Sequence, residues 1–167
     1  PVCKHVKSEC CAFISFFGCI VEKSRNYYAW FNSDGASKVV NSIFTADNST
    51  ASFRDREKKL HFYNSIDLKG RGNQEGGIYH HSITVKAGGL DLDTDTIVTN
   101  AADVALDANL APVKGSLALD IGCAEDFLTN WPSAYMNEAT RDLLGTPRVL
   151  GSAIDVGAAE YDWRRDF

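Results

Sequence analysis

The chain has 167 residues, of which 44% are hydrophobic and 23% are charged. This length suits one domain, and this composition excludes disorder, collagen and coiled coil as the main state. The 22 acidic residues outnumber the 17 Lys and Arg, so the net charge is −5 and a broad electrostatic grip on nucleic acid is not expected. The longest apolar run, residues 12–21, is shorter than the about 20 residues that cross a bilayer, so no membrane span is expected.

The cysteines gather at the N-terminal end of the chain. The five are Cys3, Cys10, Cys11, Cys19 and Cys123. Cys3 either forms a small disulfide with Cys10 or Cys11, or these residues are buried free thiols. No Cys-x-x-Cys pair occurs, so the spacing does not favour a zinc site. Because the first residue is Pro1 rather than Met, we expect a processed or excerpted chain.

A short sequence block recurs four times in the first half of the chain. The blocks are FFGCIV from Phe16, VVNSIF from Val39, FYNSID from Phe62 and YHHSIT from Tyr79. They align without gaps and place Ile20, Ile43, Ile66 and Ile83 in one column, at spacings of 23, 23 and 17 residues. β-branched and aromatic residues carry this period, and no helical periodicity lies between them. The pattern predicts a β-solenoid in which each repeat is one coil.

Stacked coils place equivalent residues about 4.8 Å apart, so the isoleucine column is predicted to be a continuous buried ladder. A second column contains Asn41, Asn64 and His81. Asn suits a tight corner, where its amide can bond its own turn and the next coil, so Asn41 and Asn64 are expected to be structural. We expect about four coils over residues 1–87. Residues 88–167 are expected to hold the last strands and the C-terminal cap of the same domain, with a short helix over residues 132–144.

Three phrases in the C-terminal half carry a resemblance to a known family. They are KGSLALDIG at residues 114–122, TRDLLGTPRV at residues 140–149 and SAIDVGAAEY at residues 152–161. They resemble the C-terminal end of secreted bacterial proteins of the pectate-lyase-like superfamily, in the form called choice-of-anchor Q. That form commonly reads G-S-P-A-x-D-x-G, D-L-x-G-x-P-R and D-I-G-A-x-E, and this chain departs from it at Leu117 and Ala159.

The resemblance implies an all-β fold, a right-handed parallel β-helix with an irregular C-terminal capping segment, secreted or on the bacterial cell surface. It also implies that the polar residues of the phrases tie the chain end across the last coils. These residues are Asp120, Arg148, Asp155 and Glu160. Since a guanidinium fork holds a carboxylate in a fixed geometry, Arg148 is expected to pair with Asp155 or Glu160. Acid–base catalysis by Asp155 or Glu160 is the alternative role.

Members of this superfamily act on polysaccharides as lyases, hydrolases or epimerases, or bind glycans without turnover. A uronate lyase needs a base and a cation that stabilises the developing negative charge. The repeat alignment places basic residues in two neighbouring columns, Lys23, Lys69 and Lys86 in one and Arg25 and Arg71 in the other. They form either a basic stripe for an acidic sugar chain or a solvated corner.

Histidines and tyrosines fall on consecutive coils. His61, Tyr63, His80 and His81 are the candidate acid and base residues, because His and Tyr both serve in proton transfer. Tyr79 is a candidate for stacking on a sugar ring. The alternative is that these residues belong to the wall or the core of the solenoid.

An acidic run follows the repeats. Asp91, Asp93 and Asp95 either converge on one Ca²⁺ ion or share an exposed strand face. The sequence therefore predicts a protein that acts on polysaccharide by lyase or glycoside hydrolase chemistry, or a non-catalytic glycan-binding or adhesive protein. The first coil, lined by residues 13–17, is expected to be covered by the N-terminal portion of the same protein as a separate chain, or by a second copy stacked end to end.

Overall fold

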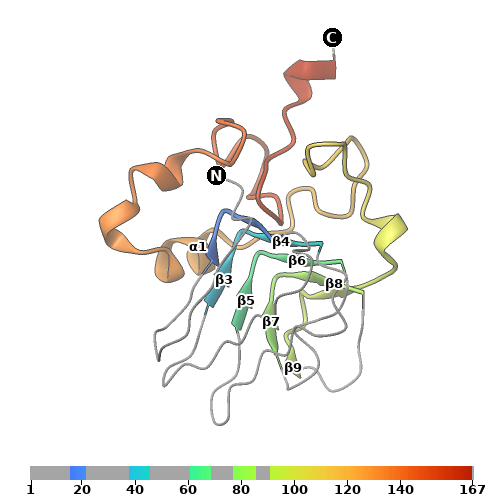
Figure 1. Ribbon diagram of the computed structural model, residues 1–167, viewed down its shortest axis with the longest axis horizontal. Coiled ribbons are helices and arrows are strands. Elements are labelled where there is room, and N and C mark those ends of the chain that lie inside the picture. The colour runs from blue at the N-terminus through green and yellow to red at the C-terminus, as the bar shows by residue number, and fades with distance from the viewer. Residues whose placement is uncertain (1–15, 22–37, 46–60, 69–76, 86–90, 167) are drawn as a thin grey trace, which may run out of the picture.

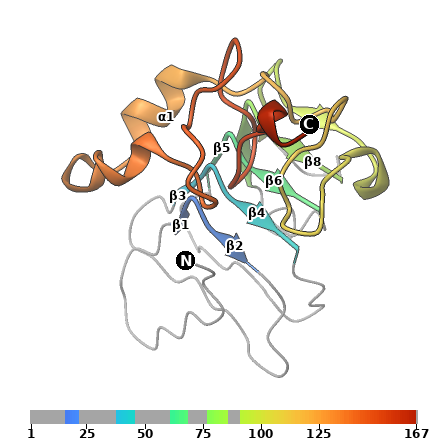
Figure 2. The same ribbon diagram turned by 90° about the horizontal axis from the view of Figure 1, so that it is seen from above.

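The computed structural model describes residues 16–21, 38–45, 61–68, 77–85 and 91–166, which contain two parallel sheets of five strands each. The first sheet consists of β1 (Phe16–Phe17), β3 (Lys38–Val40), β5 (His61–Tyr63), β7 (Ile78–His80) and β9 (Asp91–Leu92). The second consists of β2 (Ile20–Val21), β4 (Ile43–Phe44), β6 (Ile66–Asp67), β8 (Ile83–Thr84) and β10 (Ile97–Val98). Figure 1 shows β3, β5, β7 and β9 side by side, and Figure 2 shows β2, β4, β6 and β8.

The strands pair in the register in which the sequence blocks align. Ile20 lies opposite Ile43, Ile43 opposite Ile66, and Ile66 opposite Ile83. The column continues to Ile97, because β9 and β10 add one further strand to each sheet beyond the last block. Residues 13–15 of the expected first-coil surface lie outside the described residues.

A two-residue corner joins each of the first four strands of the first sheet, β1, β3, β5 and β7, to the next strand of the second sheet. Its first position is held by Gly18, Asn41, Asn64 and His81, with φ values of 58°, 44°, 47° and 44°. This left-handed conformation is free of strain for Gly, and Asn and His adopt it more readily than most other residues. The repeated choice of Gly, Asn or His therefore follows from the backbone that the corner requires.

The second corner position carries a ladder of hydroxyl groups. The backbone N–H of Ser42 donates to Ser65 Oγ at 3.2 Å, and that of Ser65 donates to Ser82 Oγ at 3.1 Å. Each hydroxyl donates in turn to the carbonyl two residues before it, at 2.9, 2.8 and 2.7 Å. All three serines are fully buried. Because an unsatisfied buried polar group costs about 1 to 3 kcal/mol, this ladder is what permits the corner to lie inside the molecule.

The isoleucine column forms the core together with the C-terminal segment, here residues 101–166. Ile43, Ile66 and Ile83 are fully buried. Four further buried residues of the same cluster come from the C-terminal half, namely Val104, Ala118, Val156 and Ala158. Gly157 has φ +116°, and a Cβ there would lie 3.0 Å from Ile66 Cδ1. The C-terminal segment therefore lies directly against the isoleucine column, as its position over the sheets in Figure 1 also shows.

The helix of the C-terminal half lies earlier than the sequence predicts. α1 spans Ala124–Asn130 and packs beside β3 and β5. The helix expected over residues 132–144 is wrong, because that segment contains only two short 3-10 turns, η3 (Ser133–Tyr135) and η4 (Glu138–Thr140). The carboxylate of Asp142 accepts the backbone N–H groups of Leu144 and Thr146 at 2.8 and 2.7 Å, which turns the chain back instead of continuing a helix. The other 3-10 turns are η2 (Ala101–Asp103) and η5 (Trp163–Asp166).

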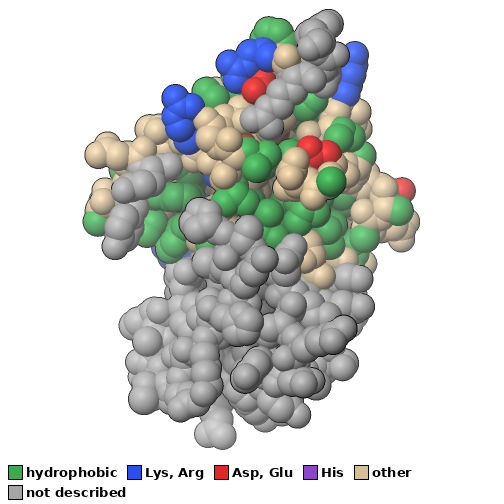
Figure 3. All heavy atoms as spheres, turned by 45° about the horizontal axis from the view of Figure 1, so that its top comes forward, with side chains coloured by type: hydrophobic (Ala, Val, Ile, Leu, Met, Phe, Trp, Pro, Cys, Tyr) green, Lys and Arg blue, Asp and Glu red, His purple; other side chains and the backbone are tan. Residues whose placement is uncertain are grey.

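Within the described ranges, no helix has both the length and the apolar content needed to cross a bilayer. On the face drawn in Figure 3, hydrophobic side chains gather below the Lys and Arg side chains at the upper end. Leu128, Val149 and Trp163 are the most exposed large hydrophobic residues described. Exposed apolar residues of this kind are ordinary on folded proteins and carry no assignment.

Candidate functional site

The candidate site begins with three rings on the outer side of the first sheet. In β5 the side chain of Phe62 is fully buried, so the alternation along a strand turns His61 and Tyr63 to the opposite side. Tyr63 lies opposite His80 of β7 in the parallel register. His61, Tyr63 and His80 therefore share one face, and Tyr63 packs against the cluster that contains Phe127 of α1.

The three rings are nearly parallel and their polar atoms meet. Tyr63 and His80 stack with centroids 4.6 Å apart, and His61 and His80 with centroids 5.6 Å apart. His61 Nδ1 lies 3.3 Å from the Tyr63 hydroxyl and 3.4 Å from His80 Nε2. On its other side, His80 Nδ1 lies 3.7 Å from Asp93 Oδ2. The phenol, the two imidazoles and the carboxylate therefore form a row of consecutive polar contacts.

The electrostatic surroundings define the role of the phenol. Burial raises the pKa of Tyr63 above its ordinary value, and the negative charge of Asp126 raises that pKa further. The phenol therefore stays protonated through neutral pH and can donate to His61 Nδ1 when that nitrogen carries no proton. A protonated phenol next to an imidazole is an acid and base pair in the arrangement that general acid–base catalysis requires.

A lysine that the sequence analysis did not single out lies beside these rings. Lys38 of β3 is opposite His61 in the register, and neighbouring strands are about 4.8 Å apart. Its ammonium group donates to Asn130 Oδ1 at 2.8 Å. The signal was present in the sequence, because Lys38 and His61 each directly precede a repeated block. The basic residues that were expected to bind substrate lie outside the described residues, namely Lys23, Arg25, Lys69, Arg71 and Lys86.

Tyr79 does not belong to the candidate site. It lies opposite Phe62 in the register and is, like Phe62, fully buried. The two rings stack with centroids 4.4 Å apart, and the Tyr79 hydroxyl donates to Asp67 Oδ2 at 2.6 Å. Burial and the neighbouring Asp67 carboxylate hold the pKa of this phenol well above its usual range. The expectation that Tyr79 stacks on a sugar is therefore wrong, because neither face of its ring is accessible.

A second polar cluster surrounds His81. Its Nδ1 lies 2.9 Å from Asp126 Oδ2 and its Nε2 lies 3.2 Å from Asp95 Oδ2. Its backbone N–H donates to Asp93 Oδ2 at 3.0 Å. One imidazole nitrogen of His81, the Sγ of Cys123 and a carboxylate oxygen of Asp126 all lie within 4.8 Å of one another.

Of the three aspartates expected to hold Ca²⁺, the structure describes the side chains of Asp93 and Asp95. Asp93 Oδ1 accepts the Thr96 hydroxyl at 2.8 Å and the backbone N–H of Asp95 at 3.2 Å. Asp93 and Asp95 both approach His81, whereas the side chain of Asp91 lies outside the described residues. Within the described part of the chain, the atoms that converge with metal-ligand chemistry are those of His81, Cys123 and Asp126.

The asparagines of the corner column bind the C-terminal segment. Asn64 is fully buried, accepts the backbone N–H of Cys123 at 2.7 Å and donates to the carbonyl of Cys123 at 2.8 Å. Its own carbonyl accepts the N–H of Gly157 at 2.9 Å. Asn41 donates to the carbonyl of Asp155 at 3.4 Å and accepts from Asn64 at 3.5 Å. These contacts agree with a structural role for both asparagines.

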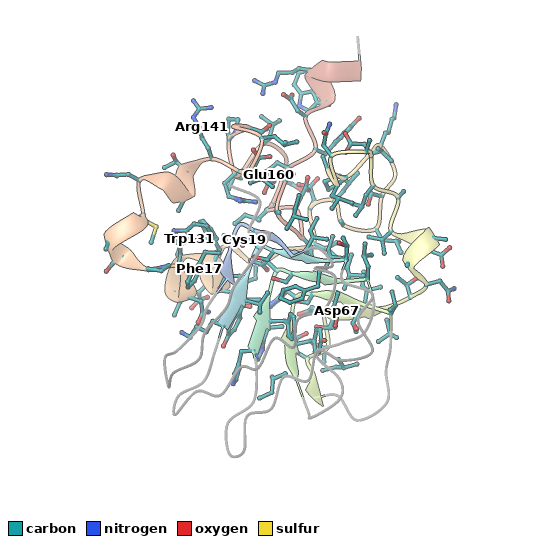
Figure 4. The ribbon with its side chains drawn as sticks, in the orientation of Figure 1. Phe17, Cys19, Asp67, Trp131, Arg141 and Glu160 are labelled. Carbon is teal, nitrogen blue, oxygen red and sulfur yellow. The ribbon has the colours of Figure 1, made fainter. Side chains whose placement is uncertain are left out.

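A buried charge cluster ties the C-terminal segment together. Arg148 and Glu160 are only 3% and 2% exposed, and Arg148 Nη1 lies 3.4 Å from Glu160 Oε1. Glu160 Oε2 accepts the backbone N–H of Asp155 at 3.0 Å, and Asp142 Oδ2 accepts that of Glu160 at 2.7 Å. In Figure 4, the side chain of Glu160 lies among the turns of the C-terminal segment, whereas the exposed side chain of Arg141 points outward. Since substrate cannot reach this cluster, Asp155 and Glu160 are structural here and not a catalytic pair.

The cluster predicts a decrease in stability with rising pH. Burial raises the pKa of Glu160 from 4.5 to about 8, and Arg148 offsets only part of this effect. The folded state therefore binds more protons than the unfolded state between these two values. The contribution of Glu160 to stability is complete below about pH 4.5 and is lost as the pH rises toward 8, on the order of a few kcal/mol. Urea unfolding of the parent protein across this pH range should show the decrease.

The variant Glu160→Gln isolates this contribution, because glutamine keeps the acceptor oxygen and has no titratable group. We expect a flatter dependence of the free energy of unfolding on pH than in the parent chain. Glu125→Gln, at an exposed position of α1, is the control and should keep the parent dependence. Equal pH dependence in Glu160→Gln and the parent would contradict the assignment.

Cys123 and Asp126, like Lys38, are site residues that the sequence analysis did not identify. They follow His81 by more than forty residues, and no local spacing links them to it. Comparison with protein-family models, with curated proteins and with solved structures found no match for this chain. The assignment of function therefore depends on the geometry of the site itself.

Proposed function

We propose that this chain is part of a right-handed parallel β-helix protein of the pectate-lyase-like type, secreted or on the cell surface of a bacterium, that cleaves a uronate polysaccharide by β-elimination. The observation that carries this proposal is the contact chain from Tyr63 through His61 and His80 to Asp93. The in-register parallel pairing of the block strands supports the fold.

The proposed reaction uses the residues in distinct roles. The imidazole pair of His61 and His80 takes the proton from the carbon next to the substrate carboxylate, and Asp93 stabilises the imidazolium that forms. The electron pair of this C–H bond forms the double bond as the bond to the leaving glycosidic oxygen breaks. Tyr63 gives its phenolic proton to that oxygen, and His61 returns a proton to Tyr63 across their 3.3 Å contact.

The negative charge that develops on the substrate needs a cation close to the imidazole pair. Lys38, one strand away from His61, supplies this charge. A carboxylate held between Lys38 and the rings would place the adjacent C–H bond over the imidazole pair. This arrangement favours an acidic sugar over a neutral one, because a neutral sugar offers no group for the ammonium to neutralise.

The test is turnover of a panel of uronate-containing and neutral glycans, measured by the ultraviolet absorbance of the unsaturated product. We expect activity on a uronate polymer, and a decrease in kcat of about 10² to 10⁴-fold in Tyr63→Phe. This variant keeps the ring stack and removes only the hydroxyl group. Tyr161→Phe, in the C-terminal segment, is the matched control and should keep the parent activity.

Two outcomes would contradict the proposal. If Tyr63→Phe cleaves at the parent rate, the phenol is not the acid. If the parent protein retains glycans on an affinity column without releasing an unsaturated product or new reducing ends, the protein is a glycan-binding or adhesive protein and not a lyase.

A further inference from the structure

We propose that His81, Cys123 and Asp126 form a Zn²⁺ site with one open coordination position. The three residues come from two parts of the chain, His81 from the corner between β7 and β8 and the other two from the start of α1. Their ligand atoms converge within 4.8 Å, and all three side chains are half-buried, so an ion can reach them. This proposal is independent of the proposed lyase activity.

The observed spacing is close to that of a tetrahedral zinc site. Zinc binds imidazole nitrogen and carboxylate oxygen at about 2.0 to 2.2 Å and thiolate sulfur at about 2.3 Å, which places ligand atoms about 3.2 to 3.6 Å apart. His81 Nδ1 and Asp126 Oδ2 are 2.9 Å apart. This pair must open by a few tenths of an ångström, and the sulfur must close by a side-chain rotation, to accept the ion.

The surroundings of His81 leave one nitrogen for the ion. Nε2 faces Asp95 Oδ2 at 3.2 Å, so Nδ1 is the nitrogen that faces Asp126 and Cys123. A metal-bound imidazole almost always donates its other N–H to a carboxylate, a carbonyl or water, which fixes the ring. Asp95 occupies this position, and Asp93 holds the backbone N–H of His81 at 3.0 Å.

Cys123 is also held in place before any ion arrives. Its backbone N–H and carbonyl are both bonded to the buried amide of Asn64, at 2.7 and 2.8 Å. Its thiol forms no disulfide. Cys123 is the N-cap residue of α1 and Asp126 is the third residue of the helix, so both lie at its first turn. The site is thus preorganised from both of its parts.

The ligand chemistry favours zinc over a hard cation. Calcium and magnesium bind oxygen ligands, whereas a set of one nitrogen, one sulfur and one oxygen suits zinc. A thiolate and a carboxylate together neutralise the charge of a divalent ion. Three protein ligands leave the fourth position for water or another oxygen ligand, as in zinc sites with an open position.

The first experiment titrates the protein with Co²⁺, a spectroscopic substitute for Zn²⁺. The background variant carries Cys3→Ser, Cys10→Ser and Cys11→Ser, so that only Cys19 and Cys123 retain thiols. We expect one equivalent of Co²⁺ to give a sulfur-to-cobalt charge-transfer band that Zn²⁺ abolishes. If this background does not fold, the difference between the parent chain and Cys123→Ser gives the same measurement. Absence of the band in both the triple variant and the parent chain would overturn the proposal.

The second experiment measures Zn²⁺ affinity by competition with a chelating dye. His81→Asn removes the imidazole and keeps a residue that already holds this corner position in two other coils, so it should fold. We expect His81→Asn and Cys123→Ser each to lose more than about 100-fold in affinity, and Asp95→Asn to lose about 10 to 100-fold. Glu125→Gln, next to Asp126 on α1, is the control and should bind as the parent does. Parent affinity in His81→Asn or Cys123→Ser, or Ca²⁺ binding as tight as Zn²⁺ binding, would overturn the assignment.

Discussion

Replacing Arg148 with alanine is expected to lower the free energy of unfolding by about 3 to 5 kcal/mol above about pH 8, where Glu160 is ionised and loses its buried partner. The guanidinium lies against Glu160 and the carbonyls of Gly157 and Ala158, all at 3.4 Å. It also lies beside Gly18 of the first corner. Without Arg148, the buried carboxyl groups around it lose their cation and the C-terminal segment loses its contact with the corner at Gly18.

Chemical denaturation of Arg148→Ala measures this loss directly. Arg141→Ala is the matched control, because Arg141 stands in the same phrase, is exposed and donates only to the carbonyl of Gly145 among its described contacts. The control should change stability by about 0.5 kcal/mol or less. Glycan turnover per folded molecule should be unchanged in Arg148→Ala. Parent stability with lost turnover would instead place Arg148 in the active site.

Replacing Ile43 with alanine is expected to lower the free energy of unfolding by about 2 to 5 kcal/mol, the usual cost of emptying a buried isoleucine site. Ile43 is fully buried between Ile20 and Ile66 in the column. Its side chain also lies against Gly157, where a Cβ would come within 3.2 Å of Ile43 Cδ1. The neighbours on three sides are held by the sheet and by the C-terminal segment, so the cavity cannot collapse.

Denaturant unfolding measures the free energy of unfolding of Ile43→Ala, and two further variants provide values for comparison. Ile43→Val removes one methylene and should cost about 0.5 to 1.5 kcal/mol. Val98→Ala removes a side chain that is 42% exposed at the end of the second sheet, and should cost about 0.5 kcal/mol or less. A loss below about 0.5 kcal/mol in Ile43→Ala would refute the buried ladder.

The corner column connects the fold to the candidate sites. Gly18 lies under Trp131, where a Cβ would come 3.3 Å from the indole, and Figure 4 shows Trp131 next to Phe17. Further along the column, Asn41 contacts Asp155, Asn64 contacts Cys123, and His81 contacts Asp126. Asn41, Asn64 and His81 therefore have two roles, because each adopts the left-handed backbone of the corner and its side chain contacts the C-terminal segment.

The sequence by itself determined the register of the strands. Inward positions must match from coil to coil if they are to share one core, so the repeated isoleucine could align in only one way. The Gly, Asn or His two positions before each isoleucine also repeats in the sequence, because few other residues adopt the left-handed corner backbone. The pairing of Arg148 with Glu160 was also among the expected alternatives, because one buried cation needs a buried anion close by.

The fifth strand pair escaped the sequence analysis for a local reason. Between Tyr63 and Ile66 the corner has two residues, whereas between Leu92 and Ile97 the connection has four. An ungapped alignment therefore fails at Ile97, although Ile97 lies opposite Ile83. The burial of Tyr79, by contrast, could have been predicted from the sequence, because Tyr79 aligns with Phe62 at an inward position of the block.

Only the tertiary structure decided the composition of the candidate sites. Cys123 and Asp126 join His81 through the docking of α1, which leaves no local spacing in the chain. Lys38, by contrast, joins His61 through the strand register that the repeated blocks already predict. The helix itself formed over Ala124–Asn130 because this segment buries Phe127 against Val40 and Trp131, whereas the later segment was turned by Asp142. Long-range packing of this kind outweighs the weak local preferences of a seven-residue helix, which is why the sequence could not place it.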